Sequence, residues 1–176
     1  MAQQTVLSII AEVTACIVSP QMTRKYVCYP KTLADTWARF YENFNFPGVL
    51  GCIDCTQIAI IKPTEHEEHF YCRKHYHSLN VQLICDADMP ITSVDASYVG
   101  ATHDSFIWHV YPLKHYLESL DKSTWLLGDS GYPLRKYMMI PVIFAVPGTP
   151  DSHYTALHVR TRNIIERIIG LLKACY

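Results

Sequence analysis

The chain has 176 residues, 49% hydrophobic and 18% charged, a composition that excludes a disordered protein and is typical of a globular one. This length suits one compact domain and leaves no room for a second large one. The formal net charge of −1 excludes nucleic-acid binding through overall charge, so any such binding must depend on local basic patches.

The N-terminal part of the chain is predicted to be helical. Residues 5–19 are apolar but contain Glu12 and are too short and interrupted to span a bilayer, so we expect a helix packed on a core and no membrane role. Residues 32–44 repeat apolar side chains at helical spacing, which predicts a second helix. Residues 1–46 are therefore interpreted as an N-terminal helical segment.

After this segment the pattern changes to that of β-strands. Three apolar runs bounded by turn-forming or charged residues predict three strands, at residues 51–61, 78–86 and 91–99. Residues 86–90 have the composition of a hairpin turn between the second and third strands, which explains their two aspartates.

The last part of the chain alternates helices and strands. A helix is expected to begin near Asp104 and to kink or restart at Pro112, followed by a short strand at residues 125–127. Residues 140–146 predict a fifth strand, and a closing helix starts at about Ala156. This order of elements predicts an α/β fold with a mixed sheet flanked by helices.

Asp129 stands where the strand at residues 125–127 runs into a tight turn. Gly128 leaves room beside it, and the Ser-Gly-Tyr-Pro sequence that follows breaks the strand. A buried charge without a partner is costly, so this carboxylate is expected to pair, to cap backbone or to hold a metal ion.

Two other acids occupy unusual positions. Alternation along residues 51–61 places Asp54 among apolar neighbours, although backbone N–H groups could satisfy an aspartate there. Glu166 lies in a helix with wide apolar coverage, and the alternative is a solvated ion pair with Arg162, four residues earlier.

A mixed sheet could bring these three carboxylates together. Hard divalent cations such as Mg²⁺ or Mn²⁺ prefer carboxylate oxygens, which makes Asp54, Asp129 and Glu166 candidate metal ligands. Two such ions about 3.5 to 4 Å apart would activate a water and stabilise the leaving oxygen of a phosphodiester.

Four ordered motifs, GCIDCT, THDSFIW, LLGDSGYP and RTRNIIERIIGLLK, resemble the nuclease domain of PIF/Harbinger-type transposases and the Harbinger transposase-derived nucleases. The resemblance covers residues 47–176. It implies a ribonuclease H-like fold, with catalytic acids of the DDE type at Asp54 and Asp129 on strands and Glu166 on a late helix.

This resemblance implies a divalent-metal-dependent DNA endonuclease in the nucleus, with the cytoplasm as a second location and a Myb-like accessory protein as partner. Two basic clusters could contact phosphates. One consists of Arg73, Lys74, His75 and His77, and the other, which we expect to contact DNA phosphates, consists of Arg160, Arg162, Arg167 and Lys173. The rival hypothesis is a catalytically silent remnant that only binds protein or DNA.

The motif that contains His103 and Asp104 also recurs in the family. Asp104 is interpreted either as the N-cap of the crossover helix or as an accessory metal or water contact. His103 either supports that contact or is a structural, hydrogen-bonded histidine.

The chain departs from the family pattern at Gln57, where the family has His, and at Val99, where it has Pro. Relatives also carry a helix-turn-helix segment before the nuclease domain and continue beyond the glutamate helix. We therefore expect this chain to be a fragment, a truncated gene product or a decaying copy.

Two other groups of potential metal ligands do not match known metal motifs. The seven cysteines are expected to be reduced, and strand alternation turns Cys52 and Cys55 of the single CxxC to opposite faces. His66 and His69 are one residue too close for a HExxH zinc motif, so a solvated loop is expected there.

Overall fold

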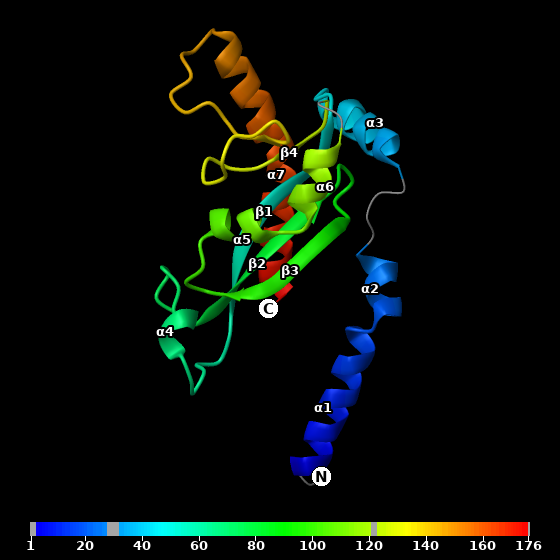
Figure 1. Ribbon diagram of the computed structural model, residues 1–176, viewed down its shortest axis with the longest axis vertical. Helices are drawn as coiled ribbons and strands as arrows, with labels where there is room; N and C mark the ends of the chain where they lie inside the picture. The colour runs from blue at the N-terminus through cyan, green and yellow to red at the C-terminus, as the bar shows by residue number, and fades with distance from the viewer. Residues whose placement is uncertain (1–2, 28–31, 121–122, 176) are drawn as a thin grey trace.

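The computed structural model describes residues 3–27, 32–120 and 123–175. Seven helices and five strands are described in these ranges (Figure 1). In chain order they are α1 (Gln3–Ile17), α2 (Pro20–Tyr26), α3 (Leu33–Phe44), β1 (Val49–Ala59), α4 (Glu67–Phe70), β2 (Ser78–Cys85), β3 (Ile91–Val99), α5 (Asp104–Val110), α6 (Leu113–Ser119), β4 (Trp125–Leu127), β5 (Met138–Met139) and α7 (Pro150–Cys175).

The five strands form one mixed sheet in the order β3-β2-β1-β4-β5. β1 is antiparallel to β2 along most of its length and parallel to β4, with Cys52 opposite Leu127. β2 and β3 are antiparallel, and β4 and β5 are parallel. The expected α/β, ribonuclease H-like arrangement of a mixed sheet with flanking helices is confirmed.

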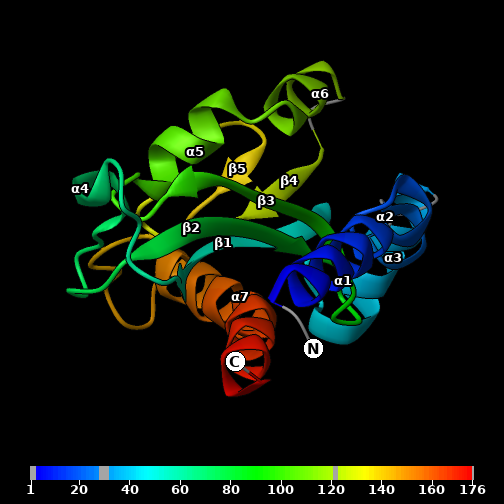
Figure 2. The same ribbon diagram turned by 90° about the horizontal axis from the view of Figure 1, so that it is seen from below.

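Helices cover both faces of the sheet because alternate side chains of the central strand point to opposite faces. Cys52 belongs to a buried cluster that includes Phe40 of α3 and Ile165 of α7. Ile53 belongs to a second cluster that includes Trp108 of α5 and Leu126 of β4. Figure 2 shows α7 on one side of the sheet and α5 and α6 on the other.

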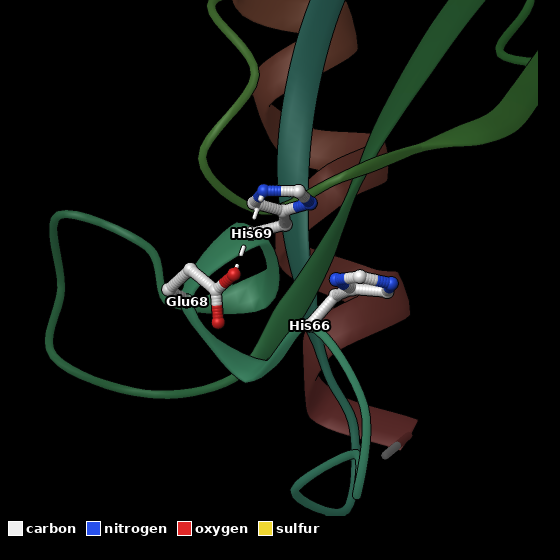
Figure 3. Close-up of side chains that lie close together, drawn as sticks. All are labelled: His66, Glu68 and His69. Carbon is white, nitrogen blue, oxygen red and sulfur yellow. Dashed lines mark ion pairs between the residues drawn. The ribbon is translucent and has the colours of Figure 1, made fainter.

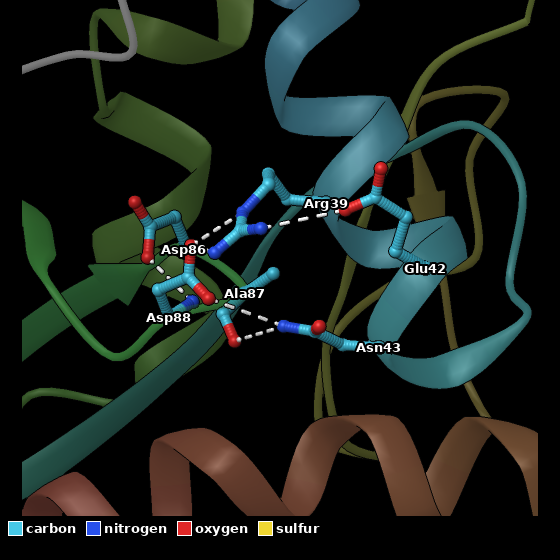
Figure 4. Close-up of polar contacts among 6 residues, drawn as sticks. All are labelled: Arg39, Glu42, Asn43, Asp86, Ala87 and Asp88. Atoms are coloured by element: carbon cyan, nitrogen blue, oxygen red, sulfur yellow. Dashed lines mark hydrogen bonds and ion pairs between the residues drawn. The ribbon is translucent and has the colours of Figure 1, made fainter.

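Polar contacts attach α3 to the turn between β2 and β3 (Figure 4). The Arg39 side chain donates to the Asp88 carboxylate at 2.7 Å, and the Asn43 amide donates to the Ala87 carbonyl at 3.2 Å. Within the turn, the Asp88 N–H donates to the Asp86 carboxylate at 2.9 Å. The expected hairpin turn is confirmed, and both aspartates are engaged in it.

The N-terminal helix differs from its prediction. No side chain of α1 is buried, so the expectation that this helix packs on a core is wrong for the described residues; Figure 1 shows α1 and α2 extending away from the sheet. The predicted 5–19 helix ends at Ile17 because Ser19 caps a new helix, its hydroxyl accepting from the Met22 N–H at 3.4 Å. The boundary predicted after residue 46 stays a prediction, although Phe40 of α3 lies in the sheet's core.

Among the described residues, no single helix has the length and hydrophobicity to cross a membrane. α1 and α2 taken together meet that test by length and composition alone, with a bend of 52° between them.

The predicted strand at residues 140–146 is wrong, because the fifth strand is the short β5 at Met138–Met139. Pro141 has no N–H to donate to a strand ladder, and Phe144 has a left-handed backbone with φ of 62° and a 95% exposed side chain. The final helix begins at Pro150 rather than near Ala156, because the Thr149 hydroxyl accepts from the Ser152 N–H at 3.3 Å.

Other local predictions agree with the structure. β3 spans the predicted residues 91–99, and the crossover region is two helices, α5 and α6, that restart at Pro112. The solvated loop expected at residues 66–69 instead contains the helical turn α4, although its side chains are largely exposed. Six cysteines of the described residues are free thiols, and Cys28 lies outside those residues.

Candidate functional site

Asp54 and Asp129 lie two residues beyond the last residues that pair between β1 and β4. Cys52 of β1 pairs with Leu127 of the parallel strand β4, and both side chains belong to the core on the α7 face. Asp54 lies further along β1, on the same face as Cys52 by alternation, and Asp129 follows the end of β4. The negative charge of Asp129 acts on Asp54, so the two predicted acids lie near each other at this end of the paired strands.

Glu166 is joined to this pair of acids by an arginine. The Arg162 guanidinium donates to the Asp54 carboxylate at 2.7 Å and to the Glu166 carboxylate at 2.8 Å. The side chains of Asp54 and Arg162 are only 17% and 10% exposed, whereas that of Glu166 is 57% exposed. Below, Asp54, Asp129 and Glu166 are called the carboxylate centre.

The electrostatics of Asp54 indicate an excess of negative charge. Burial raises the pKa of the Asp54 carboxyl, while Arg162 and the Cys55 N–H, at 2.9 Å, lower that pKa. The negative charges of Asp129 and Asp104 raise the pKa of Asp54 further. These carboxylates are therefore close enough to repel one another, and a cation bound among them would relieve that repulsion.

Asp104 belongs to this neighbourhood. It is the first residue of α5, whose N-cap is His103, and no side-chain hydrogen bond caps the helix. The Asp104 carboxylate instead accepts from the buried Asn80 amide at 2.7 Å, and the same amide donates to the Thr102 carbonyl at 2.8 Å. Asp104 is thus fixed beside the site, whereas His103 is exposed.

Gln57, at the position of the family's histidine, connects β1 to the same loop. Its amide donates to the Gly100 carbonyl at 3.3 Å, and its carbonyl accepts from the Ser78 hydroxyl at 2.6 Å. Gln57 therefore helps to hold the segment that leads to Asp104.

The two thiols of the CxxC face opposite sides of the sheet, as alternation predicts. The Cys52 thiol contacts the Thr161 carbonyl of α7 at 3.7 Å, and the Cys55 thiol contacts the Tyr132 hydroxyl at 3.3 Å. The pair cannot chelate one ion from these positions.

A polar cavity of about 280 Å³ opens next to Asp104. Its lining includes Asn80 and three basic side chains from different parts of the chain, Arg73, Lys74 and Lys173. The sequence shows Arg73 and Lys74 as a basic cluster, but only the fold reveals that they face Lys173 of α7 across one cavity.

The predicted basic residues of α7 have different surroundings. Arg160, Arg167 and Lys173 are exposed on the helix, whereas Arg162 is buried against the carboxylates. The immediate neighbours of Arg162 in the sequence, Thr161 and Asn163, are polar and give no sign of this inward position. The signal that could have shown it is helical spacing, because Arg162 lies three residues before the buried Ile165.

The donor set has the chemistry that a hard divalent cation requires, since Asp54, Asp129 and Asp104 offer carboxylate oxygens around an excess of negative charge. In the described residues, however, the three acids of the centre do not form a group with all ligand atoms within 4.8 Å, a condition met by His66, Glu68 and His69. Arg162 stands between Asp54 and Glu166. The residue types therefore suit a hard divalent cation, whereas the placement of the three side chains does not bring their ligand atoms together.

Comparison with known proteins places the chain in a family. The DDE superfamily endonuclease family matches residues 53–176. The proteins named "Putative nuclease HARBI1" from Bos taurus and Homo sapiens are each 30% identical to the chain, over 98% of it and 50% of their own length. The Arabidopsis thaliana protein named "Protein ALP1-like" is 20% identical over 84% of the chain and 40% of its own length.

The chain spans about half the length of the HARBI1 relatives that it matches. No solved structure matches it. The match covers three of the four motifs in full and includes all three predicted acids, on a sheet of the expected order. The chain therefore belongs to the DDE superfamily endonucleases, as a Harbinger-derived nuclease domain.

Proposed function

We propose that this domain is a divalent-metal-dependent DNA endonuclease that hydrolyses phosphodiesters at Asp54, Asp129 and Glu166. The observation that carries the proposal is the network of charges around Asp54. Arg162 contacts both Asp54 and Glu166, and the negative charge of Asp129 raises the pKa of Asp54.

Asp54 and Asp129 would hold the metal ion, because Asp54 on β1 is largely shielded from water and Asp129, directly after β4, is close enough to raise its pKa. A bound Mg²⁺ or Mn²⁺ supplies an activated water and neutralises charge on the leaving oxygen. Glu166 is the most exposed of the acids that Arg162 contacts, so it can turn towards the ion when the guanidinium releases it.

Arg162 is the internal counter-ion of the metal-free centre. A buried carboxylate such as Asp54 needs a compensating charge, and Arg162 supplies it at 2.7 Å. On this proposal the guanidinium leaves Asp54 when a cation takes over the same task, and it becomes available to the substrate phosphate.

The basic cavity beside Asp104 would receive the DNA backbone. Arg73, Lys74 and Lys173 line it, and Arg160 and Arg167 extend the positive charge along α7. Contacts of this kind position a strand without reading its sequence.

The test is a plasmid-nicking assay in Mn²⁺ with the wild type and Asp129→Asn. We expect the substitution to lower the cleavage rate by at least about 100-fold, above the 10–100-fold typical of groups that only support a metal ligand. Asp151→Asn, an exposed substitution in the first turn of α7, is the matched control and should cleave normally. Equal cleavage by wild type and Asp129→Asn would contradict the assignment of Asp129 to the catalytic site.

A catalytically silent remnant that binds DNA or protein is the second candidate. The observation in its favour is Arg162, which already neutralises Asp54 and keeps it apart from Glu166. Calorimetric titration with Mn²⁺ separates the two functions. Binding that Asp54→Ala abolishes supports the endonuclease, and the absence of binding in both proteins supports the remnant.

A further inference from the structure

We propose that His66, Glu68 and His69, the α4 cluster, form a second metal site that binds a transition-metal ion of the Zn²⁺ class. One ligand atom from each of the three side chains lies within 4.8 Å of the other two. Figure 3 shows the three side chains around the α4 turn, with a dashed line joining Glu68 to His69. The site is separate from the carboxylate centre and does not depend on the proposed nuclease activity.

The two imidazoles of the α4 cluster lie against each other. Their ring centroids are 5.5 Å apart with an interplanar angle of 10°, and the His69 Nε2 is 3.7 Å from the Glu68 carboxylate. His66 has a left-handed backbone with φ of 52°, a conformation that is uncommon for a residue with a side chain. That conformation puts His66 at the N-cap, where its ring reaches the ring of His69 one turn later.

The backbone that carries the cluster is held in place. The His69 N–H donates to the His66 carbonyl at 3.0 Å, and the His69 carbonyl accepts from the Ala101 N–H at 3.1 Å. The neighbouring Glu67 points elsewhere, since its carboxylate contacts Lys62 at 2.5 Å and His77 at 3.3 Å. The two acids of the turn thus have different tasks: Glu67 anchors it, and Glu68 stays beside the histidines.

The ligand types select the class of cation. Imidazole suits Zn²⁺, Cu²⁺ and Ni²⁺, whereas Mg²⁺ and Ca²⁺ prefer sites made of oxygen. Zinc binds imidazole nitrogen at about 2.0–2.1 Å and completes its four positions with water when the protein gives three ligands. The side chains can close the remaining gap by changing rotamer, because all three are exposed.

A metal ion bound by the α4 cluster would affect the loop that leads to the carboxylate centre. The hydrogen bond from Ala101 to His69 connects α4 to the loop of residues 100–104, which ends at Asp104 beside the carboxylate centre. Metal bound by the α4 cluster would therefore hold this loop from outside.

The test is calorimetric titration of Zn²⁺ into the full chain, carried out in excess Mg²⁺ and in the Asp129→Asn background. The double variant His66→Gln/His69→Gln is expected to lose one equivalent of Zn²⁺ or to bind it at least tenfold more weakly. The matched control, His109→Gln/His153→Gln, removes two exposed histidines far from α4 in the sequence and should bind like the parent. The exposed thiols of Cys16 and Cys175 are present in every protein compared.

Glu68→Gln gives a second, independent reading, because it keeps both imidazoles and alters only the carboxylate. We expect it to weaken Zn²⁺ binding without changing the far-ultraviolet circular dichroism spectrum. The proposal is overturned if the His66→Gln/His69→Gln protein is folded and retains the parent's Zn²⁺ stoichiometry and affinity. Because the background lacks Asp129, neither result depends on whether the domain cleaves DNA.

Discussion

The carboxylate centre and the α4 cluster both gather metal-ligating side chains, but they balance charge in different ways. In the carboxylate centre the Asp54 side chain is only 17% exposed, and a guanidinium from α7 contacts both Asp54 and Glu166. In the α4 cluster the ligands are exposed, and Lys62 pairs with Glu67 rather than with Glu68. A buried charged side chain needs a counter-ion within the protein, because removing water from a charge is costly. A cation must displace that guanidinium in the first site, whereas in the second site Glu68 contacts only His69, itself a proposed ligand, among the ion pairs of the described residues.

Replacing Arg162 should have the largest effect on stability. Arg162→Met leaves the buried Asp54 without its partner, and we expect unfolding free energy to fall by about 3–5 kcal/mol in the absence of metal. Because Mn²⁺ can neutralise Asp54 in place of the guanidinium, the ion should restore more stability to this variant than it adds to the wild type. Urea denaturation with and without Mn²⁺ measures both effects.

The control for that measurement is Arg167→Met, which removes an exposed arginine from the same helix. It should leave stability nearly unchanged in both conditions. If Arg162→Met were as stable as Arg167→Met without metal, Asp54 would not need an internal counter-ion and the contrast between the two sites would fail.

Asn80 tests whether Asp104 belongs to the working centre. Asn80→Ala removes the amide that holds both Asp104 and the Thr102 carbonyl, so cleavage should fall by about 10–100-fold, the range for groups that orient a ligand. The nicking assay measures this loss. Asn43→Ala, which also frees a turn but at the α3 contact, is the matched control.

Unchanged cleavage by Asn80→Ala would make Asp104 a structural residue only. Mn²⁺ titration of the same variant then shows whether the metal-binding residues are intact. A loss of cleavage with Mn²⁺ binding retained would assign Asp104 to positioning rather than to tight metal binding.

These two sites also show what sequence can predict. Alternation along β1 predicts the face on which Asp54 lies, because side-chain direction in a strand follows from local geometry, and the end of the neighbouring strand β4 explains why Asp129 is near it. The contact of Arg162 with Asp54 could not be predicted from strand alternation, since it depends on how α7 lies over the sheet. The sequence predicts a solvated loop at residues 66–69, because the spacing of His66 and His69 departs from the HExxH zinc motif. Their actual proximity depends on the left-handed backbone of His66, which the sequence does not reveal.

The fold itself shows the same division. The order of the elements follows from periodicity, and the mixed sheet was expected from it. The apolar run at 140–146 has the hydrophobicity of a strand, yet Pro141 and the exposed Phe144 keep it out of the sheet. Apolar residues in α1 likewise gain no burial, so composition alone overestimates the core.

His158 should make the stability of the domain depend on pH. It is a buried titratable group of α7 and has no carboxylate partner among its described contacts. Burial lowers the pKa of His158 below 6.5, and its Nε2 hydrogen donates to the Met139 carbonyl at 3.1 Å. The unfolded chain therefore takes up a proton first as pH falls below about 6.5, so stability should drop there by at most about 1.4 kcal/mol per pH unit. Above that pH the contribution is constant.

Urea denaturation at about pH 7.5, 6.5 and 5.5 measures this slope. His158→Gln keeps a donor for Met139 but does not titrate, so its stability should fall less steeply. The exposed His153→Gln should keep the wild-type slope. If both variants had the same slope as the wild type, the acid sensitivity would come from other groups.

Replacing Lys62 should have the smallest effect on stability, in clear contrast to replacing Arg162. The Lys62 ammonium and the Glu67 carboxylate are 2.5 Å apart, closer than the 2.7 Å between Arg162 and Asp54. Their side chains are 61% and 44% exposed, however, so water already stabilises each charge and the pair adds little. Thermal unfolding of Lys62→Met should therefore show no measurable change in Tm. A loss as large as that of Arg162→Met would mean that the ion pair itself, and not burial, sets the dependence of a site on its counter-ion.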